Sequence, residues 1–310
     1  MSSFFTRRAI CPYKSAGRYG IIISCRSRCG IYPEKGGTAL NILVTLDRGY
    51  LHQLAVMLSS LLTADPAETY DVYLMNASLR PSDFEKLTAM LGNRCRLTDV
   101  RMDSRLLAEA PVTDRYPQEM YYRIFAAQYL PQTLDRILYL DPDLVVRKPL
   151  RALYETDMTG QCFAAASHVR GALKALNAIR LGERPDEMGP YINSGVMLMN
   201  LARLRETQDE AQVLDYIRRH QKALLLPDQD IISALYAGQI RLIDARIYNM
   251  TERLLVFGNA NGEVTPHWVA ENSAVIHYCG RNKPWKPHYT GKLGIFYEQA
   301  EQAANPPAFD

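Results

Sequence analysis

Short apolar runs typical of buried strands alternate with segments of helical spacing along the first half of the chain. The predicted strands cover residues 41–45, 70–75, 95–100 and 136–140. The predicted helices cover residues 51–63, 82–91 and 118–129, and the second lies between Pro81 and Gly92. This βαβαβαβ order predicts an α/β fold, a single twisted and mostly parallel Rossmann-like sheet with helices on both faces.

The second half of the chain, residues 151–300, has a less regular pattern. Helical spacing recurs at 203–220 and 228–237, and there is neither an internal repeat nor a linker rich in Gly or Ser. We therefore expect one domain over residues 40–300, with residues 1–39 and 301–310 as tails outside it.

Charge separates the first 39 residues from the rest. They carry a net charge of +6, so the whole-chain value of +3 leaves −3 for the remainder. This mildly acidic body gives no electrostatic reason to expect nucleic-acid binding. The only apolar stretch of the tail, 21–23, is too short for a secretory signal, and the Arg- and Ser-rich composition also suits a transit peptide. We favour disordered or non-native sequence upstream of a start near Leu40.

Hydropathy and cysteine usage bear on the compartment. No apolar run reaches the roughly 18–20 residues that cross a bilayer, so we do not expect an integral membrane protein. The six cysteines form no CxxC pair and fit a reducing compartment. The expectation is a cytoplasmic protein with at most peripheral association at the inner face of the membrane.

Two aspartates directly follow the clearest apolar strand. Asp141 and Asp143 flank Pro142, and in an extended backbone residues two apart point to the same side. Converging carboxylates repel unless a cation compensates, and oxygen ligands suit Mg²⁺ or Mn²⁺. A solvated turn is the alternative, because Asp-Pro-Asp is also good turn chemistry. The apolar runs on both sides favour the metal site, since desolvated carboxylates need a partner.

A second polar cluster lies in residues 275–285, VIHYCGRNKPW. His277 follows a short apolar strand, Gly280 permits a close approach of the backbone, and Lys283 supplies a compact cation. A lone histidine is more often structural than a ligand. Together with the two aspartates it makes a plausible ligand set, in which the imidazole favours Mn²⁺ over Mg²⁺.

The chain resembles glycosyltransferase family 8, retaining enzymes that include bacterial lipopolysaccharide galactosyl- and glucosyltransferases and glycogenin. Four blocks match in order over about 40–297: residues 41–62, 138–149, 191–201 with 226–232, and 277–285. The resemblance implies a GT-A fold and transfer of a hexose with retention. UDP-glucose or UDP-galactose would be the donor, and a glycan or a lipopolysaccharide-type glycolipid would be the acceptor.

Carried over residue by residue, the resemblance implies a Mn²⁺ held by Asp141, Asp143 and His277, which bridges the donor's phosphates. Lys283 and the backbone at Gly280 would contact the diphosphate. A metal and a lysine would stabilise the charge that develops on UDP as it leaves.

The resemblance also implies contacts to the uridine and the donor sugar. Asp47 would bond the uracil and Tyr50 would stack on it, with core packing as the alternative for the tyrosine. Arg123 would lie near the donor sugar, with a surface helix charge as its alternative. Asn193 would bind a sugar hydroxyl, and Gly195 would allow the close turn after it.

Residues 226–232 supply the last implied contacts. Asp228 would accept bonds from donor hydroxyls, and Gln229 would face the reactive side of the sugar. An amide is a weak nucleophile, so front-face displacement is favoured over the two-carboxylate chemistry of hydrolases.

The sequence departs from the family pattern at three positions. Gly49 removes a polar contact to uridine, and Pro142 lacks an N–H. His168 replaces an acidic acceptor contact, which argues against a galactose acceptor.

Other classes explain the sequence less well. No GxGxxG follows the first strand and there is no Walker P-loop, which removes the main support for dinucleotide and P-loop chemistry. A nucleotidyltransferase usually carries a Gly-rich phosphate loop, and 41–50 does not look like one. A silent nucleotide-sugar-binding protein would need a broken metal set, and an interaction module would not explain four ordered polar blocks.

Overall fold

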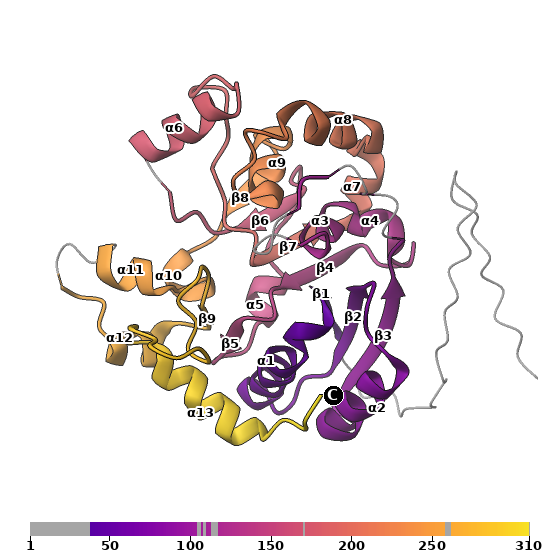
Figure 1. Ribbon diagram of the computed structural model, residues 1–310, viewed down its shortest axis with the longest axis vertical. Coiled ribbons are helices and arrows are strands. Elements are labelled where there is room, and N and C mark those ends of the chain that lie inside the picture. Colours follow the sequence, from indigo (N-terminus) through magenta and orange to yellow (C-terminus); the bar gives the residue numbers. More distant parts are fainter. Residues whose placement is uncertain are drawn as a thin grey trace, which may run out of the picture.

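The computed structural model describes residues 38–103, 107, 110–112, 117–169, 171–257 and 262–309. A seven-stranded sheet in the order β3-β2-β1-β4-β7-β6-β8 crosses the centre of the molecule (Figure 1). Its strands are β1 (Leu40–Thr45), β2 (Tyr70–Asn76), β3 (Cys95–Arg101), β4 (Arg136–Leu140), β6 (Phe163–Ala165), β7 (Val196–Asn200) and β8 (Ile240–Leu242). The four strands predicted in the first half of the chain are confirmed as β1 to β4.

Most neighbours in this sheet are parallel. β1 pairs in parallel with β2 and β4, β2 with β3, and β6 with β8, whereas β7 is antiparallel to both β4 and β6. The mostly parallel α/β sheet is therefore confirmed. Because β1 and β4 run side by side in the same direction, the segments that follow them begin at the same edge of the sheet.

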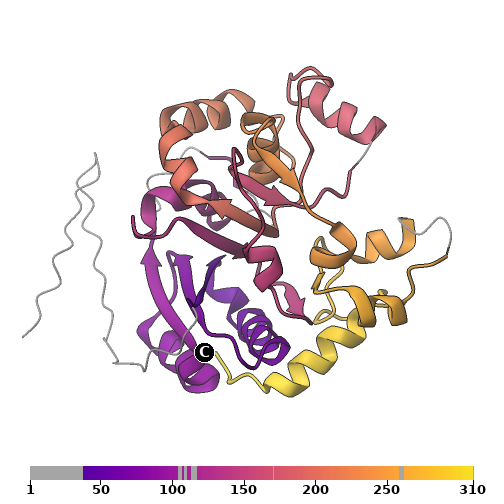
Figure 2. The same ribbon diagram turned by 180° about the vertical axis from the view of Figure 1, so that it is seen from behind.

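Helices cover both faces of the sheet, as Figure 1 and the reverse view in Figure 2 show. The longer ones are α1 (Leu51–Ala64), α2 (Pro81–Leu91), α6 (Ala172–Arg180), α7 (Leu201–Thr207), α8 (Glu210–His220), α9 (Pro227–Leu235), α12 (Pro266–Asn272) and α13 (Gly294–Ala304). The shorter ones are α3 (Glu119–Tyr122), α4 (Ala126–Tyr129), α5 (Arg151–Tyr154), α10 (Ala245–Tyr248) and α11 (Glu252–Phe257).

The two faces bury separate apolar cores because side chains alternate along each strand. Ile42 packs with the face that α1 and α2 cover, and its neighbour Leu43 packs with the face that α4, α7 and α8 cover. Both are fully buried. The strands are apolar on both sides, as expected for a sheet covered on both faces.

Two predicted helices are interrupted. The helix expected at 118–129 consists of α3 and α4 separated by a 3₁₀ turn, Arg123–Phe125. The helix expected at 203–220 divides into α7 and α8 because the Asp209 side chain accepts bonds from the N–H groups of Ala211 and Gln212 and caps a new helix.

The structure describes little of the expected N-terminal tail but most of the expected C-terminal tail. The tail at 1–39 lies outside the described residues except for 38 and 39. The boundary expected at residue 300 falls inside α13, and beyond it Lys86 Nζ donates to Ala308 O at 2.7 Å. None of the helices among the described residues is long and apolar enough to cross a membrane.

A small second sheet, which the sequence did not predict, pairs two distant segments. β5 (Leu144–Val146) and β9 (Val275–His277) are antiparallel, with Leu144 opposite His277. Tyr278 N donates to Asp143 O at 3.1 Å, which extends the pairing toward the aspartates. This sheet therefore holds the C-terminal histidine next to the turn that follows β4.

Asp230 fixes the start of α9. It is completely buried, and its carboxylate accepts bonds from Arg180, from Tyr191 Oη at 2.7 Å and from the backbone N–H groups of Leu225 and Leu226. These bonds tie the turn before α9 to α6 and to the segment before β7.

Replacing Asp230 by Ala leaves the Arg180 guanidinium and two backbone donors without their acceptor. We expect a loss of about 3–5 kcal/mol in the free energy of unfolding, measured by urea denaturation, because a largely buried ion pair is broken on one side. Asp186→Ala is the control, since Asp186 pairs with Arg184 at the surface with both side chains about 70% exposed. It should change the free energy of unfolding by less than about 1 kcal/mol. Equal effects of the two variants would contradict this role.

Candidate active site

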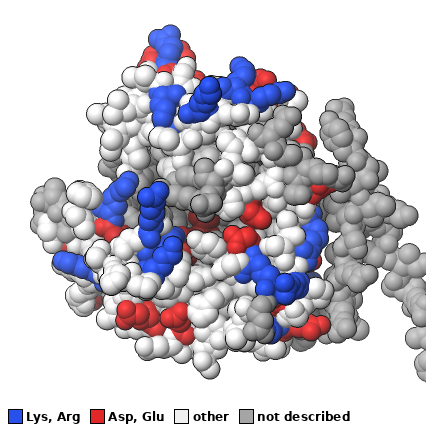
Figure 3. Space-filling view, viewed as in Figure 1, with Lys and Arg blue, Asp and Glu red and all other residues white. Residues whose placement is uncertain are grey.

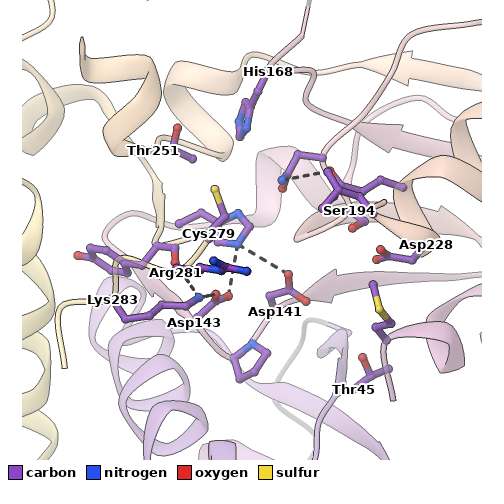
Figure 4. Close-up of a pocket in the computed structure, with 18 of the residues that line it drawn as sticks. Thr45, Asp141, Asp143, His168, Ser194, Asp228, Thr251, Cys279, Arg281 and Lys283 are labelled. Atoms are coloured by element: carbon purple, nitrogen blue, oxygen red, sulfur yellow. Dashed lines mark hydrogen bonds and ion pairs between the residues drawn. The ribbon is translucent and has the colours of Figure 1, made fainter. Parts of the chain in front are cut away.

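A cavity of about 830 Å³ opens where β1 and β4 end. The residues that line it include Asp47, Tyr50, Arg123, Asp141, Asp143, Asn193, Asp228, Gln229, His277, Gly280 and Lys283. The structure therefore brings together every site residue proposed from the sequence except Gly195, which lies behind the wall. Figure 4 shows Asp143 and Lys283 on one side of this pocket, Ser194 and Asp228 on the other, and Asp141 between them.

Asp141, Asp143 and His277 converge on one point. Their potential ligand atoms all lie within 4.8 Å of one another, and His277 Nε2 is 3.7 Å from Asp141 Oδ2 and 3.3 Å from Asp143 Oδ1. The sequence predicted that the two aspartates converge through an extended backbone, and this prediction is wrong. Asp141-Pro142-Asp143 forms a turn between β4 and β5, and the turn together with β9 produces the convergence.

A chain of hydrogen bonds fixes the tautomer of His277. Gly195 N, which can only donate, bonds to Asn193 Oδ1 at 3.1 Å, and Asn249 Nδ2 donates to the same oxygen at 2.9 Å. Asn249 Oδ1 therefore faces His277 Nδ1, 2.9 Å away, and must accept a hydrogen bond from the Nδ1–H group. In the neutral imidazole the lone pair is therefore on Nε2, which faces the two aspartates.

This arrangement fits a cation. A neutral imidazole lone pair directed at two carboxylates is repulsive unless a positive charge lies between them. Asp143 Oδ1 is buried and no hydrogen-bond donor reaches it. Two carboxylate oxygens and one imidazole nitrogen are ligands that suit Mn²⁺, and the Nδ1–H bond to Asn249 is the kind of outer contact that orients a ligating histidine.

Gly195 leaves the space that the histidine and Asp141 occupy. A Cβ atom built at this position would overlap His277 Cε1 and would lie 2.8 Å from Asp141 Oδ2. Gly195 O also accepts a bond from Asp141 N at 2.8 Å. The glycine is thus required for close packing behind the candidate metal site, in addition to the turn that the sequence suggested.

The other oxygen of Asp141, Oδ1, is bonded by side chains from β4 and from the 3₁₀ turn at Arg123. Tyr139, two residues earlier on the same side of β4, donates its hydroxyl to Asp141 Oδ1 at 2.5 Å, and Arg123 Nη1 lies 2.9 Å from the same atom. The Arg123 guanidinium also packs over the Tyr139 ring at 4.3 Å. Asp141 Oδ2 is left to face His277.

Arg123 also binds Asp228. Its Nη1 is 3.0 Å from Asp228 Oδ2, and both side chains are buried, so Arg123 is not the surface helix charge that was its alternative. Burial raises the pKa of Asp228, and Arg123 offsets only part of this shift. The 3₁₀ turn at Arg123–Phe125 places the guanidinium between the two aspartates.

Lys283 pairs directly with Asp143. Its Nζ bonds to Asp143 Oδ2 and donates to Tyr278 O at 2.8 Å. Burial favours a higher pKa for Asp143, but the Lys283 ammonium opposes it, and that pKa lies below its usual range. The lysine and the candidate cation thus bind the same carboxylate through different oxygens, Oδ2 and Oδ1.

Aromatic packing positions the loop after β9. The Trp285 ring lies 5.0 Å from that of Tyr297 and meets the Tyr50 ring edge-on at 6.5 Å, between centroids. Tyr50 is only partly buried and still lines the cavity. Asp47 accepts a bond from Gly49 N at 2.6 Å, so the short turn after β1 carries both proposed uridine contacts.

Two amides and a histidine complete the far wall. Asn193 Nδ2 contacts Gln229 Oε1 at 3.4 Å, which joins Gln229 to the chain that ends at His277. His168 Nε2 donates to Asn249 O at 2.9 Å. Burial lowers the pKa of His168 to about 4, so this side chain is neutral at pH 7.

Sequence analysis missed Asn249 and Tyr139. Tyr139 could have been found from its spacing of two residues before Asp141 on a strand. Asn249 gives no such signal, because a bridge between Met250 and Ile276 brings it beside β9 only in the folded chain.

Comparison with known proteins identifies the family. The model of glycosyl transferase family 8 matches residues 41–288. This chain belongs to glycosyl transferase family 8. Over 250 residues it is 27% identical to a lipopolysaccharide 1,2-glucosyltransferase of Escherichia coli K12, covering 79% of this chain and 72% of that protein. It is 25% identical over 260 residues to general stress protein A of Bacillus subtilis 168, covering 79% of this chain and 87% of that protein.

The fold of this family 8 member matches a solved structure. The galactosyltransferase LgtC, in complex with donor and acceptor sugar analogs, superposes with a TM-score of 0.73 at 23% sequence identity. The match covers 87% of this chain and 98% of that one. The chain therefore has the GT-A fold that the sequence resemblance implied.

Gly195→Ala tests the packing behind the candidate metal site of this family 8 protein. The added methyl would displace His277 and Asp141, so we expect Mn²⁺ affinity to fall at least about tenfold, as measured by titration with electron paramagnetic resonance. Gly238→Ala is the matched control, because nothing lies within 4 Å of a Cβ there. Circular dichroism should show both variants folded, and equal Mn²⁺ affinity in the two would refute the steric argument.

Asn249 substitutions test the tautomer argument. Asn249→Ala removes the acceptor of the Nδ1 proton, and we expect Mn²⁺ affinity to fall by about 10–100-fold, as for other outer contacts of metal ligands. Asn249→Asp keeps an acceptor at His277 Nδ1 and should retain most of the affinity. The same titration measures both variants, and a loss that is as large in Asn249→Asp would show that tautomer control is not what Asn249 provides.

Proposed function

We propose that this protein transfers glucose or galactose from a UDP-sugar to a glycan or a lipopolysaccharide-type acceptor, with retention and with Mn²⁺. The observation that carries the proposal is the convergence of Asp141, Asp143 and His277 Nε2 in the cavity where β1 and β4 end. The family and the GT-A fold support glycosyl transfer as the reaction class.

Asp141, Asp143 and His277 would hold the metal ion through the oxygens and nitrogen that face one another. When bound, Mn²⁺ (or Mg²⁺ in its place) would offset the negative charge of the diphosphate as the sugar–phosphate bond breaks. Lys283, which is already next to Asp143, and the backbone at Gly280 would bind the diphosphate from the loop after β9.

The turn after β1 would bind the nucleoside. Asp47 would accept a bond from the uracil, and the partly buried Tyr50 ring would stack on it, supported from its edge by Trp285. Gly49 offers no side chain to the uridine, and a Cβ there would lie 2.9 Å from Asp47 Oδ1.

The opposite wall would orient the donor sugar. Asp228 would accept bonds from sugar hydroxyls while Arg123 keeps its carboxylate in place, and Asn193 would bind a further hydroxyl. Gln229 would face the anomeric carbon. Its amide is a weak nucleophile, and the neighbouring carboxylate, Asp228, is engaged by Arg123.

These contacts favour front-face displacement. The acceptor hydroxyl oxygen would bond to the anomeric carbon on the face that UDP leaves, while the bond from that carbon to the phosphate oxygen breaks. The hydroxyl proton would pass to a phosphate oxygen of the departing UDP. The configuration at the anomeric carbon is then retained without a covalent enzyme intermediate, in contrast with hydrolases that use two carboxylates.

The names of relatives support the choice of sugars and acceptor. One relative is a lipopolysaccharide 1,2-glucosyltransferase, and the structural neighbour is a galactosyltransferase. Synthesis of a surface glycan from UDP-sugars would place the protein in the cytoplasm, with at most peripheral contact with the inner face of the membrane.

Metal dependence tests the proposal. Purified protein should release UDP from UDP-glucose or UDP-galactose when Mn²⁺ is present, and EDTA should reduce that release to background because the diphosphate loses its counter-charge. Asp143→Ala should lower the rate by at least about a thousandfold, since it removes a ligand and the partner of Lys283.

A coupled assay of UDP release over a panel of UDP-sugars makes this measurement. Asp99→Ala is the matched control, because Asp99 is a partly exposed carboxylate on β3 that does not line the cavity. Unchanged release in EDTA, or equal rates in the two Ala variants, would contradict the proposed function.

A further inference from the structure

Three basic side chains line one wall of the cavity without a partner. Arg253, Arg281 and Lys286, together called the cationic wall, are exposed. Within the described part of the chain, none of the three side chains has a hydrogen bond or an ion pair. In Figure 3, basic side chains border the side of the face on which Figure 1 places α11 and β9, while acidic side chains lie nearer its centre.

Side-chain contacts hold the two segments of the cationic wall together. Glu252, the neighbour of Arg253 at the start of α11, accepts bonds from Tyr289 Oη at 2.7 Å and from Leu293 N at 2.5 Å. The segment that follows Lys286 is thereby attached to α11. Glu252 already has two donors at Oε1 and provides no ion pair to Arg253, although it is the adjacent acid.

Arg253 lies near His168. It is close enough to act electrostatically on both His168 and Cys279, which also line the cavity. His168 is at the position where the family resemblance places an acceptor contact. Arg253 therefore lies toward the acceptor end of the cavity.

The buried acids of the proposed donor site have cationic partners other than Arg253 and Lys286. Asp141, Asp143 and Asp228 are opposed by Arg123 and Lys283, which pair with them directly. A divalent cation would offset the two negative charges of a diphosphate. Arg281, which Figure 4 draws on the same side of the pocket as Lys283, is available to the donor's phosphates.

We propose that the acceptor carries an anionic group, a phosphate or a carboxylate, which Arg253 and Lys286 bind. The proposal rests on the proposed function, because it assigns the acceptor of the same cavity. An arginine offers paired N–H donors that match either anion, and a lysine adds a mobile point charge. Two unpaired cations at the mouth of a cavity also raise the local concentration of an anionic substrate.

The test uses protein loaded with Mn²⁺ and UDP, so that the donor site is filled. Ligand-observed NMR titrations compare glucose 6-phosphate, glucuronate and glucose as probes. We expect the phosphate or the carboxylate probe to bind at least about fivefold more tightly than glucose, since exposed ion pairs contribute modestly and two act together. The stronger of the two anionic probes identifies which anion the cationic wall selects.

Variants separate the cationic wall from general charge effects. The double variant Arg253→Glu with Lys286→Glu should lose the preference for an anionic probe while its affinity for UDP stays within about twofold. Lys222→Glu, an exposed cation outside the cavity, should keep the preference.

Three results would overturn the proposal. The first is equal affinity for glucose and both anionic probes, and the second is a preference for an anionic probe that survives in the double variant. The third is a tenfold fall in UDP affinity in the double variant, which would assign the two cations to the donor. If the native protein does not bind UDP with Mn²⁺, the proposed function fails first, and it fails in the loading step rather than in the probe titration.

Discussion

The antiparallel pairing of β5 with β9 is the contact on which the site depends. It joins residue 144 to residue 277 and so places His277, which lies 134 positions after Asp143 in the chain, against the turn that carries both aspartates. The central sheet alone would place only the aspartates at its edge. Without the small sheet, neither His277 nor Lys283, in the loop after β9, would be held beside the two aspartates.

Hydrogen bonds of fixed direction then make this group of side chains suitable for a cation. The N–H of Gly195 determines how the Asn193 amide is oriented, and Asn193 in turn orients Asn249. The Asn249 side-chain oxygen then accepts a hydrogen bond from the Nδ1–H group of His277. On the other side, Tyr139 and Arg123 occupy one oxygen of Asp141. With Lys283 on Asp143 Oδ2, each of the three residues is left with one ligand atom that faces the same point.

The sequence predicted the parts of this arrangement that depend on local pattern. Apolar runs located β1 to β4, and Asp141, Asp143 and His277 were recognised because each follows such a run. The break at Asp209 and the 3₁₀ turn at Arg123 do not follow from the pattern, since helical spacing continues through both. At Asp209 the side chain bonds to two backbone N–H groups and caps a new helix. The role of Asn249 depends on the contact of Met250 with β9, which is set by tertiary folding and leaves no periodic signal.

The proposed function requires a single cation bound by Asp141, Asp143 and His277. Anomalous diffraction at the manganese absorption edge, from crystals grown with Mn²⁺ and UDP, tests this requirement most directly. We expect one strong peak within about 2.3 Å of Asp141 Oδ2, Asp143 Oδ1 and His277 Nε2, with UDP phosphate oxygens completing the coordination. A manganese peak elsewhere in the cavity, or one in which Nε2 of His277 is not a ligand, would contradict it.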